Sequence, residues 1–301
     1  MTNPLFYTPF EMDPTDAMHL VVGGRQVAEK TDGASGNGFV VSFDLGMNAR
    51  TGLVNQTSAL DIQGPAIYAG FCGVCDIITQ GNNDPASFQN GIATNVQAGC
   101  EPSPGTDECW QIMPAKGLPN RYITDIEIDA KDPETVYVTV GGYGRRWFKP
   151  ADDAPGVGEG HVFVSKDAGA TFTNLSGTGA QRLPDVPADA IVLRDDQLIV
   201  GTDVGVFTSS IKGGSWSRLG TGLPNVSTFD INLDPTGKKM VAATHGRGVW
   251  VFEFAARAAR PPVTAPVRPS GGSLPATGAA PLAVVGVLLL GAAWFTRRRA
   301  T

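Results

Sequence analysis

The sequence has 301 residues, enough for one large domain or two small ones. Its 23 Lys and Arg against 29 Asp and Glu give a formal net charge of −6, which argues against nucleic-acid binding, since that usually needs a basic face. Gly (38) and Pro (22) are abundant, and hydrophobic residues make up 42%, so we expect many short strands joined by turns around an adequate core.

The N-terminal residues 1–16, MTNPLFYTPFEMDPTD, have no basic start and no apolar stretch long enough for a signal peptide. They lead directly into a strand-like pattern. We therefore expect that the chain is the C-terminal part of a longer protein, or that its gene model starts too late.

Short strand-like segments follow at intervals along the chain. Five of them end in Gly or another small residue, which would let strands converge near a central channel, so we expect them to be inner strands: Leu20–Gly23, Ile67–Gly70, Val136–Val140, Leu198–Gly201 and Met240–Ala243. Three Leu-Pro pairs each precede a further strand-like run, and these runs are Ile123–Ile128, Ala190–Leu193 and Thr228–Leu233.

All four cysteines, Cys72, Cys75, Cys100 and Cys109, lie in one short stretch of the chain. In an exported protein an even count predicts disulfides, with local Cys72–Cys75 and Cys100–Cys109 pairing favoured. The alternative is a four-thiolate zinc site, although the spacing between the last two cysteines is wide for a zinc knuckle.

The stretch 143–160, YGRRWFKPADDAPGVGEG, interrupts the strand pattern. It places aromatic rings beside arginines, which suits sugar stacking or protein contact on a loop, and the candidate ligand residues are Tyr143, Arg145, Arg146 and Trp147. The alternative is a loop whose aromatic rings pack over a sheet edge.

A motif recurs in the second half of the chain. Residues 160–172 read GHVFVSKDAGATF and residues 205–216 read GVFTSSIKGGSW, and Ile211 in the second copy replaces Asp167 in the first. The copies lie about 40–45 residues apart, which is typical of a four-stranded propeller blade. The first copy resembles the Asp-box of sialidase-type and related BNR β-propellers through Ser165, Asp167, Gly169, Thr171 and Phe172.

The resemblance implies an all-β propeller over about residues 5–254, with the box at the turn between the third and fourth strands of a blade. Asp167 would then be structural, not catalytic. The run 244–250, THGRGVW, is similar to the closing signature of extracellular BNR and VPS10-like propellers, and makes His245 and Arg247 candidates for a channel mouth. About five blades are recognisable; either further blades lie upstream or five irregular blades close by themselves.

No catalytic pair can be chosen from the sequence. Acidic residues are common, among them Asp61, Asp76, Asp125, Glu127, Asp203 and Asp230, yet nothing selects two of them for glycoside hydrolysis. No Gly-x-Ser-x-Gly elbow and no metal-ligand cluster is present, so we expect neither a metal nor a cofactor. The arginines and the tyrosine that a sialidase would need match no motif here.

The C-terminal region has two parts. Residues 255–273 (AARAARPPVTAPVRPSGGS) lack a hydrophobic pattern and predict a semi-extended spacer. The motif Leu274, Pro275, Ala276, Thr277, Gly278 then precedes the uncharged apolar stretch 279–295, and Arg297–Arg299 follow it. The stretch is barely long enough for a bilayer core, and the arginines suit the cytoplasmic side.

A simple membrane anchor would explain the apolar stretch and the arginines but not the pentapeptide. The ordered set 274–301 resembles the LPxTG sorting signal of Gram-positive surface proteins. That resemblance implies that a sortase cleaves the bond from Thr277 to Gly278 and joins Thr277 to a peptidoglycan amine. The apolar helix would hold the chain in the membrane only until then.

Together these observations predict a propeller over 1–254, a wall-spanning linker over 255–273 and a sorting signal over 274–301. The favoured function is a cell-wall-anchored module that binds a glycan or a protein without catalysis. The alternative is a glycoside hydrolase displayed on the wall, and a weaker one is a structural stalk.

Overall fold

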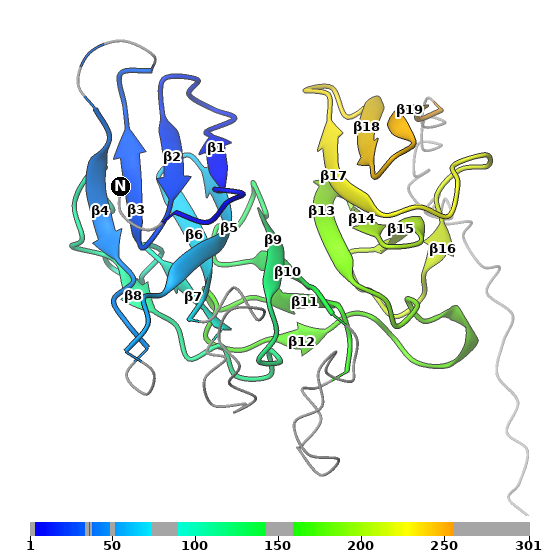
Figure 1. Cartoon of the computed structure of the whole chain (residues 1–301), viewed down its shortest axis with the longest axis horizontal. Helices are drawn as coiled ribbons and strands as arrows, with labels where there is room; N and C mark the ends of the chain where they lie inside the picture. Colours follow the sequence, from blue (N-terminus) through cyan, green and yellow to red (C-terminus); the bar gives the residue numbers. More distant parts are fainter. Residues whose placement is uncertain are drawn as a thin grey trace, which may run out of the picture. The chain divides into compact units, whose positions relative to one another are not determined.

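The computed structural model describes residues 4–33, 36, 38–48, 52–73, 90–142 and 159–255. These residues form five antiparallel sheets whose strands follow chain order, and one short 3-10 helix, η2 (Gly179–Gln181) (Figure 1). Residues 1–256 make one compact unit. The spacer from residue 256 onward and the whole sorting signal lie outside the described residues.

We call each sheet a blade and number the blades in chain order. Blades 1 to 4 have four strands and blade 5 has three. Blade 1 consists of β1 (Phe10–Met12), β2 (Leu20–Gly23), β3 (Gln26–Lys30) and β4 (Val40–Asp44), and blade 2 of β5 (Gln56–Gln63), β6 (Ala66–Cys72), β7 (Asn90–Thr94) and β8 (Gln111–Ile112). Blade 3 consists of β9 (Ile123–Ile128), β10 (Val136–Val140), β11 (Val162–Ser165) and β12 (Thr173–Asn174), and blade 4 of β13 (Ala188–Arg194), β14 (Gln197–Thr202), β15 (Gly205–Ser210) and β16 (Ser217–Arg218). Blade 5 consists of β17 (Thr228–Leu233), β18 (Lys239–Thr244) and β19 (Gly248–Glu253).

The first strand of each blade is the inner one. Contacts between neighbouring blades join β1 to β5, β5 to β9, β9 to β13 and β13 to β17. A series of antiparallel meanders that pack in this way is a β-propeller, so the predicted all-β propeller fold is confirmed.

The five segments predicted to be inner strands are instead the second strands, β2, β6, β10, β14 and β18, so that prediction was wrong. Their small residues have a different role, because they let the first strand of the next blade approach closely. A Cβ atom on Gly70 would lie 2.7 Å from Ile123 Cγ2, and one on Gly201 would lie 2.6 Å from the Thr228 carbonyl oxygen.

A β-bulge recurs at the start of four first strands. In each case the pairing with the second strand skips one residue, and the skipped residues are Ser58, Thr124, Asp189 and Phe229. A bulge puts two residues opposite one and locally breaks the alternation of side chains. Its recurrence shows that blades 2 to 5 are copies of one structural unit.

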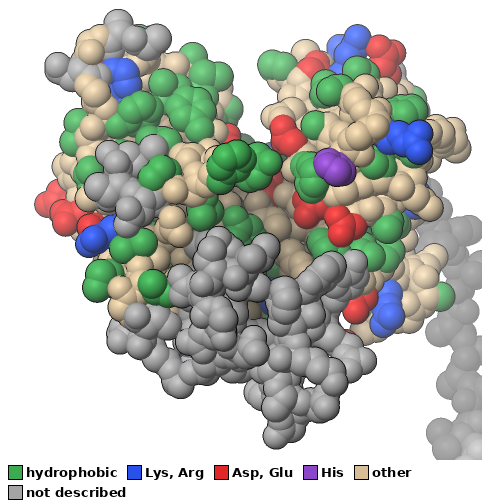
Figure 2. Space-filling view, viewed as in Figure 1, with side chains coloured by type: hydrophobic (Ala, Val, Ile, Leu, Met, Phe, Trp, Pro, Cys, Tyr) green, Lys and Arg blue, Asp and Glu red, His purple; other side chains and the backbone are tan. Residues whose placement is uncertain are grey.

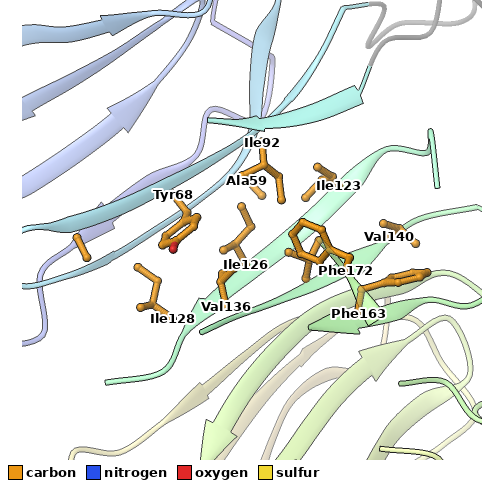
Figure 3. Close-up of a cluster of buried hydrophobic side chains, with 12 residues drawn as sticks. Ala59, Tyr68, Ile92, Ile123, Ile126, Ile128, Val136, Val140, Phe163 and Phe172 are labelled. Atoms are coloured by element: carbon orange, nitrogen blue, oxygen red, sulfur yellow. The ribbon is translucent and has the colours of Figure 1, made fainter. Parts of the chain in front are cut away.

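The apolar core is divided among the blade interfaces. One cluster joins Tyr68 and Ile92 of blade 2 to Ile126 and Val136 of blade 3 (Figure 3). Other clusters fill the interfaces between blades 1 and 2, 3 and 4, and 4 and 5. Complete burial of such an aliphatic side chain contributes about 1.5–3 kcal/mol, so blade stacking is the main source of stability.

The predicted Cys100–Cys109 disulfide is confirmed, with the two Cα atoms 5.8 Å apart. It closes the connection between β7 and β8, and it rules out a zinc site that uses all four thiolates. Cys72 is buried at the end of β6, whereas Cys75 lies outside the described residues, so their pairing stays a prediction. Within the described ranges no helix has the length and apolarity needed to span a bilayer.

Candidate functional site

Two kinds of connection lie at one end of every blade, because alternate turns of an antiparallel meander fall at opposite ends. They join the second strand to the third, and the fourth strand to the first strand of the next blade. We call this end the loop face; its described parts lie within 24–25, 45–55, 73, 113–122, 141–161, 175–187, 203–204, 219–227 and 245–247.

Both sets of predicted ligand residues fall on connections of the loop face. His245 and Arg247 lie between β18 and β19, where both are exposed. The equivalent connection of blade 3, between β10 and β11, holds the other set, which lies outside the described residues: Tyr143, Arg145, Arg146 and Trp147.

Arg121 fixes the base of the β10–β11 connection, although sequence reasoning did not select it. The residue is 6% exposed, and its guanidinium donates to carbonyl oxygens at both ends of the connection. Nε donates to Gly141 at 2.8 Å, Nη2 to Gly142 at 2.9 Å, and Nη1 to Gly160 at 2.7 Å. Burial lowers the pKa of Arg121 to about 10, so it remains a cation at neutral pH.

His161 extends this network toward solvent. Its Nδ1 lies 2.8 Å from Arg121 Nη2, and its Nε2 lies 2.8 Å from the Asp185 carboxylate, which is half exposed. Arginine has only donors, so Nδ1 accepts and Nε2 donates. Burial, followed by the charge of Arg121, lowers the pKa of His161, which favours the neutral ring.

After two of the three Leu-Pro pairs, the next residue bonds to the start of a third strand in the preceding blade. Asp185 does so through His161, which directly precedes β11. Asn120 does so through its Oδ1, which accepts from the backbone N–H of Asn90 at 2.9 Å, at the start of β7. The β6–β7 and β10–β11 connections therefore each end at a residue that is held by a hydrogen bond to the connection that follows its blade.

Two carboxylates meet on the loop face of blade 4. The Ser227 hydroxyl lies 2.8 Å from Asp203 Oδ1 and 3.4 Å from Asp189 Oδ2. Burial first, and the charge of Asp203 second, raise the pKa of Asp189 to about 7. Asp189 is a bulge residue, so this pair depends on the repeated irregularity of the first strand.

The acidic residues of the inner strands have structural partners. Asp61 accepts from Ile128 N at 2.6 Å, and Asp125 accepts from Ile191 N at 2.8 Å. Glu127 accepts from Leu193 N at 2.9 Å. Each carboxylate thus bonds the free edge of the next inner strand, and we call these three contacts the inter-blade bonds.

These inner carboxylates have perturbed acidities. Burial raises the pKa of Glu127 to about 8, and it raises the pKa values of Asp61 and Asp125 well above their usual range. The backbone donors of the next blade act in the opposite direction on all three. Because each of the three carboxylates bonds the backbone of the next blade, we assign all three a structural role.

The Asp-box residues lie at the end of blade 3 opposite the loop face, in the turn between β11 and β12. Asp167 accepts from the backbone N–H of Thr171 at 2.8 Å, and Ser165 Oγ accepts from Gly169 N at 2.8 Å. Gly169 has a φ of +89°, which favours glycine, and Phe172 is buried between blades 2 and 3. The hydrogen bonds of Asp167 are internal to the turn.

Comparison with known proteins gives structural likeness only. No protein-family model and no curated protein matches the chain. YCF48 from Cyanidioschyzon merolae is similar, with 12% identity, a TM-score of 0.49, and coverage of 82% of this chain and 67% of that chain.

Glycoside hydrolase structures are also similar. An ancestral GH74 enzyme has 17% identity, a TM-score of 0.48, and coverage of 78% of this chain and 27% of that chain. For the GH74 xyloglucanase from Xanthomonas campestris the values are 15% identity, a TM-score of 0.44, and coverage of 79% and 35%. The chain therefore spans about a quarter to a third of the length of these enzymes.

Proposed function

We propose that this chain is an exported β-propeller module, joined covalently to a Gram-positive cell wall, whose loop face binds a glycan or protein ligand. The observation that carries the binding proposal is the network around Arg121. Arg121 is a buried cation that holds both ends of one connection. Burying a charge costs free energy, so the charge requires complete hydrogen bonding. Arg121 fixes the base of the segment that holds Tyr143, Arg145, Arg146 and Trp147.

The anchoring proposal rests on the sequence of residues 274–301, which lie outside the described residues. The sortase motif, the apolar stretch and the arginines follow one another in the order that a sorting signal needs. The Cys100–Cys109 disulfide supports an exported location, because disulfides persist in oxidising compartments.

Anchoring can be tested in the source organism. Cells that carry the native chain or a Thr277→Ala variant are digested with a muralytic enzyme, and release of the protein is followed. The native chain should be released attached to wall fragments and end at Thr277 by mass spectrometry. A dominant mature form that retains Arg297–Arg299, or a Thr277→Ala variant held equally firmly in the wall, would contradict the proposal.

Ligand binding can be tested with a chain that ends at Thr277, applied to an array of wall glycans, sialosides and host glycans. Alanine variants of Arg145, Arg146 and Trp147 should each weaken a positive signal by about tenfold or more. Glu108→Ala is the matched control, because Glu108 is an exposed charged residue in the β7–β8 connection, at the opposite end of its blade. If the native chain and the three alanine variants bind equally, the segment 143–160 is not the binding site.

A wall-displayed glycoside hydrolase is the second candidate, and the carboxylate pair of blade 4 favours it. A hydrolase needs one protonated acid beside one ionised carboxylate. Asp189, with a pKa raised to about 7, suits the acid, and Asp203, on the other side of Ser227, is the neighbouring carboxyl group.

Turnover of a panel of glycosides distinguishes the two candidates. If the chain is a hydrolase, Asp189→Asn should reduce turnover by about a hundredfold or more while retaining binding. Glu108→Ala again serves as the control. Binding by the native chain without turnover on any substrate would leave the binding module as the function.

A further inference from the structure

Blade 5 presents at its open side the same acceptors that join blade 3 to blade 4. Asp230 of β17 is the first residue after the bulge, as Asp125 is in β9. Asn232 follows two positions later, where β9 has Glu127. Asp125 and Glu127 bond the next inner strand, whereas Asp230 and Asn232 are exposed on β17.

Blade 1 presents the matching donors. Bonds from Asp13 N to His19 O and from Gly23 N to Pro9 O set the hydrogen-bonded pairs of β1 and β2, so the N–H groups of Phe10 and Met12 point away from β2. No other described residue accepts from either group.

The register of these two donors matches the inter-blade bonds. Blade 1 has the segment Leu20–Gly23 (LVVG) where blade 4 has Leu198–Gly201 (LIVG). Phe10 pairs with Val22 as Ile191 pairs with Val200. Met12 pairs with Leu20 as Leu193 pairs with Leu198, and Ile191 and Leu193 are the donors to Asp125 and Glu127.

On blade 5, within the described part of the chain, Asp230 accepts only from its own neighbour, Asn232 Nδ2, at 3.1 Å. Exposed apolar side chains lie beside these acceptors and beside the outward N–H groups of blade 1. On blade 5, Val241, Val249 and Val251 share one face and are 40%, 67% and 63% exposed. The equivalent residues of blade 3 are buried against blade 4: Tyr137, Val162 and Val164. Hydrophobic side chains are also visible at the surface in Figure 2.

The end face of blade 1 has the same character. Phe10 and Met12 are 52% and 53% exposed, and Val41 of β4 is 42% exposed. Exposed aliphatic and aromatic side chains around an unpaired strand edge are features of an interaction surface.

We propose that the blade 5 face of one copy binds the blade 1 face of a second copy, head to tail, with Asp230 and Asn232 accepting from the N–H groups of Phe10 and Met12. The contact repeats the interface that joins blades 3 and 4. The blade 5 face therefore needs a blade with outward N–H groups in this register, and blade 1 of a second copy has them. Because the two surfaces differ, the association is heterologous and can close only through a suitable rotation between copies.

The test uses a chain that ends at Thr277, which retains the complete compact unit. Multi-angle light scattering and sedimentation over a range of concentrations should show reversible self-association. Three changes should each raise the dissociation constant by about tenfold or more: Met12→Pro, the pair Asp230→Ala and Asn232→Ala, and Val251→Glu.

Met12→Pro removes only an outward N–H, so the β1–β2 ladder is retained, and proline is tolerated on such an edge. Circular dichroism and thermal unfolding establish that each variant is folded, and Val251→Glu, at an exposed position, supplies a second probe. Glu108→Ala should associate like the native chain.

A mixing experiment tests the head-to-tail arrangement. The Met12→Pro chain retains a native blade 5 face, and the Asp230→Ala, Asn232→Ala chain retains a native blade 1 face. Mixed together, the two should form a one-to-one complex that neither forms alone. A native chain that stays monomeric at high concentration, or variants whose mixing restores nothing, would overturn the proposal.

Discussion

The turns between the third and fourth strands of blades 3 and 4 are attached to the protein in the same way but are built differently inside. In blade 3, Phe172 N donates to Lys116 O, and in blade 4, Trp216 N donates to Gln181 O, both at 2.7 Å. Ala168 N and Ile211 N each donate to the turn between the first two strands of their own blade. The backbone docking of the two turns is therefore similar, although Ala168 aligns with Lys212, one residue after Ile211.

Inside the turns the two blades differ. Asp167 accepts from both the backbone and the hydroxyl group of Thr171, whereas Ile211 at the equivalent position packs against the apolar cluster of blades 3 and 4. The Ser209 hydroxyl there donates to Ser215 O instead. An acid that closes the turn can thus be exchanged for apolar packing, as long as the aromatic residue and its backbone bond remain.

The largest effect should come from removing that aromatic residue. Phe172→Ala and Trp216→Ala should each destabilise the protein by about 3–5 kcal/mol, because both side chains fill blade interfaces. Trp216 also donates from Nε1 to Leu175 O, so its loss should be at the upper end. Guanidinium denaturation measures both; a loss below about 1 kcal/mol in either would show that the rings are not essential.

A smaller and unequal effect is expected at the glycines. A Cβ on Gly213 would lie 2.6 Å from both Cβ and the carbonyl oxygen of Leu175. A Cβ on Gly169 would lie 3.3 Å from the flexible Met113 side chain and 3.7 Å from Ile92 Cγ2. Both residues have positive φ. Gly213→Ala should therefore cost about 2–4 kcal/mol and Gly169→Ala about 1–2 kcal/mol in the same assay. If Gly169→Ala cost more stability than Gly213→Ala, the blade 4 turn would be the less tightly packed of the two.

Removing the acid itself should cost less than removing the ring. Asp167→Ala loses bonds from Thr171 and Ser165 at an exposed site, so we expect a loss of about 1–2 kcal/mol. Asp167→Asn, which retains one acceptor oxygen, is the matched control and should lose less. Equal losses would indicate that the charge, not the acceptor geometry, matters.

The smallest effect concerns pH. The hydroxyl bond from Thr171 is the first cause that lowers the pKa of Asp167, after which the backbone N–H of Thr171 acts in the same direction. A lowered pKa contributes stability above the unfolded value of 3.8, and this stability is lost as pH falls through the folded value. Hydrogen exchange should show protection of the Thr171 amide falling from about pH 5 to about pH 2, while protection of the Trp216 amide stays level. Parallel loss at both amides would assign the change to global unfolding.

Much of the scaffold could be predicted because its signals are local. Ile123–Ile128 is confirmed as β9 and Thr228–Leu233 as β17, since alternating apolar residues and Leu-Pro turns mark them directly. The order within a blade was predicted wrongly, because Gly70 and Gly201 look the same whether they face a channel or a neighbouring strand.

The candidate site was harder to predict, because its contacts join residues that are far apart in the sequence. Arg121 bonds to residues about 20 and 40 positions away. Asp189 and Asp203 share the hydroxyl of Ser227, which lies in the connection to the next blade. Such contacts depend on blade stacking and leave no local pattern. One signal was present: β9 reads ITDIEI, and its alternating acids mark an inner strand that bonds its neighbour.

The repeated bulge gives this architecture a position for diversification. A residue that the ladder skips is released from the strict inside-outside order, so its chemistry can change while the packed interfaces stay intact. The four blades already carry a small alcohol at Ser58, a branched one at Thr124, an acid at Asp189 and a ring at Phe229. Each new blade of this type therefore brings one interchangeable side chain to the loop end of its inner strand.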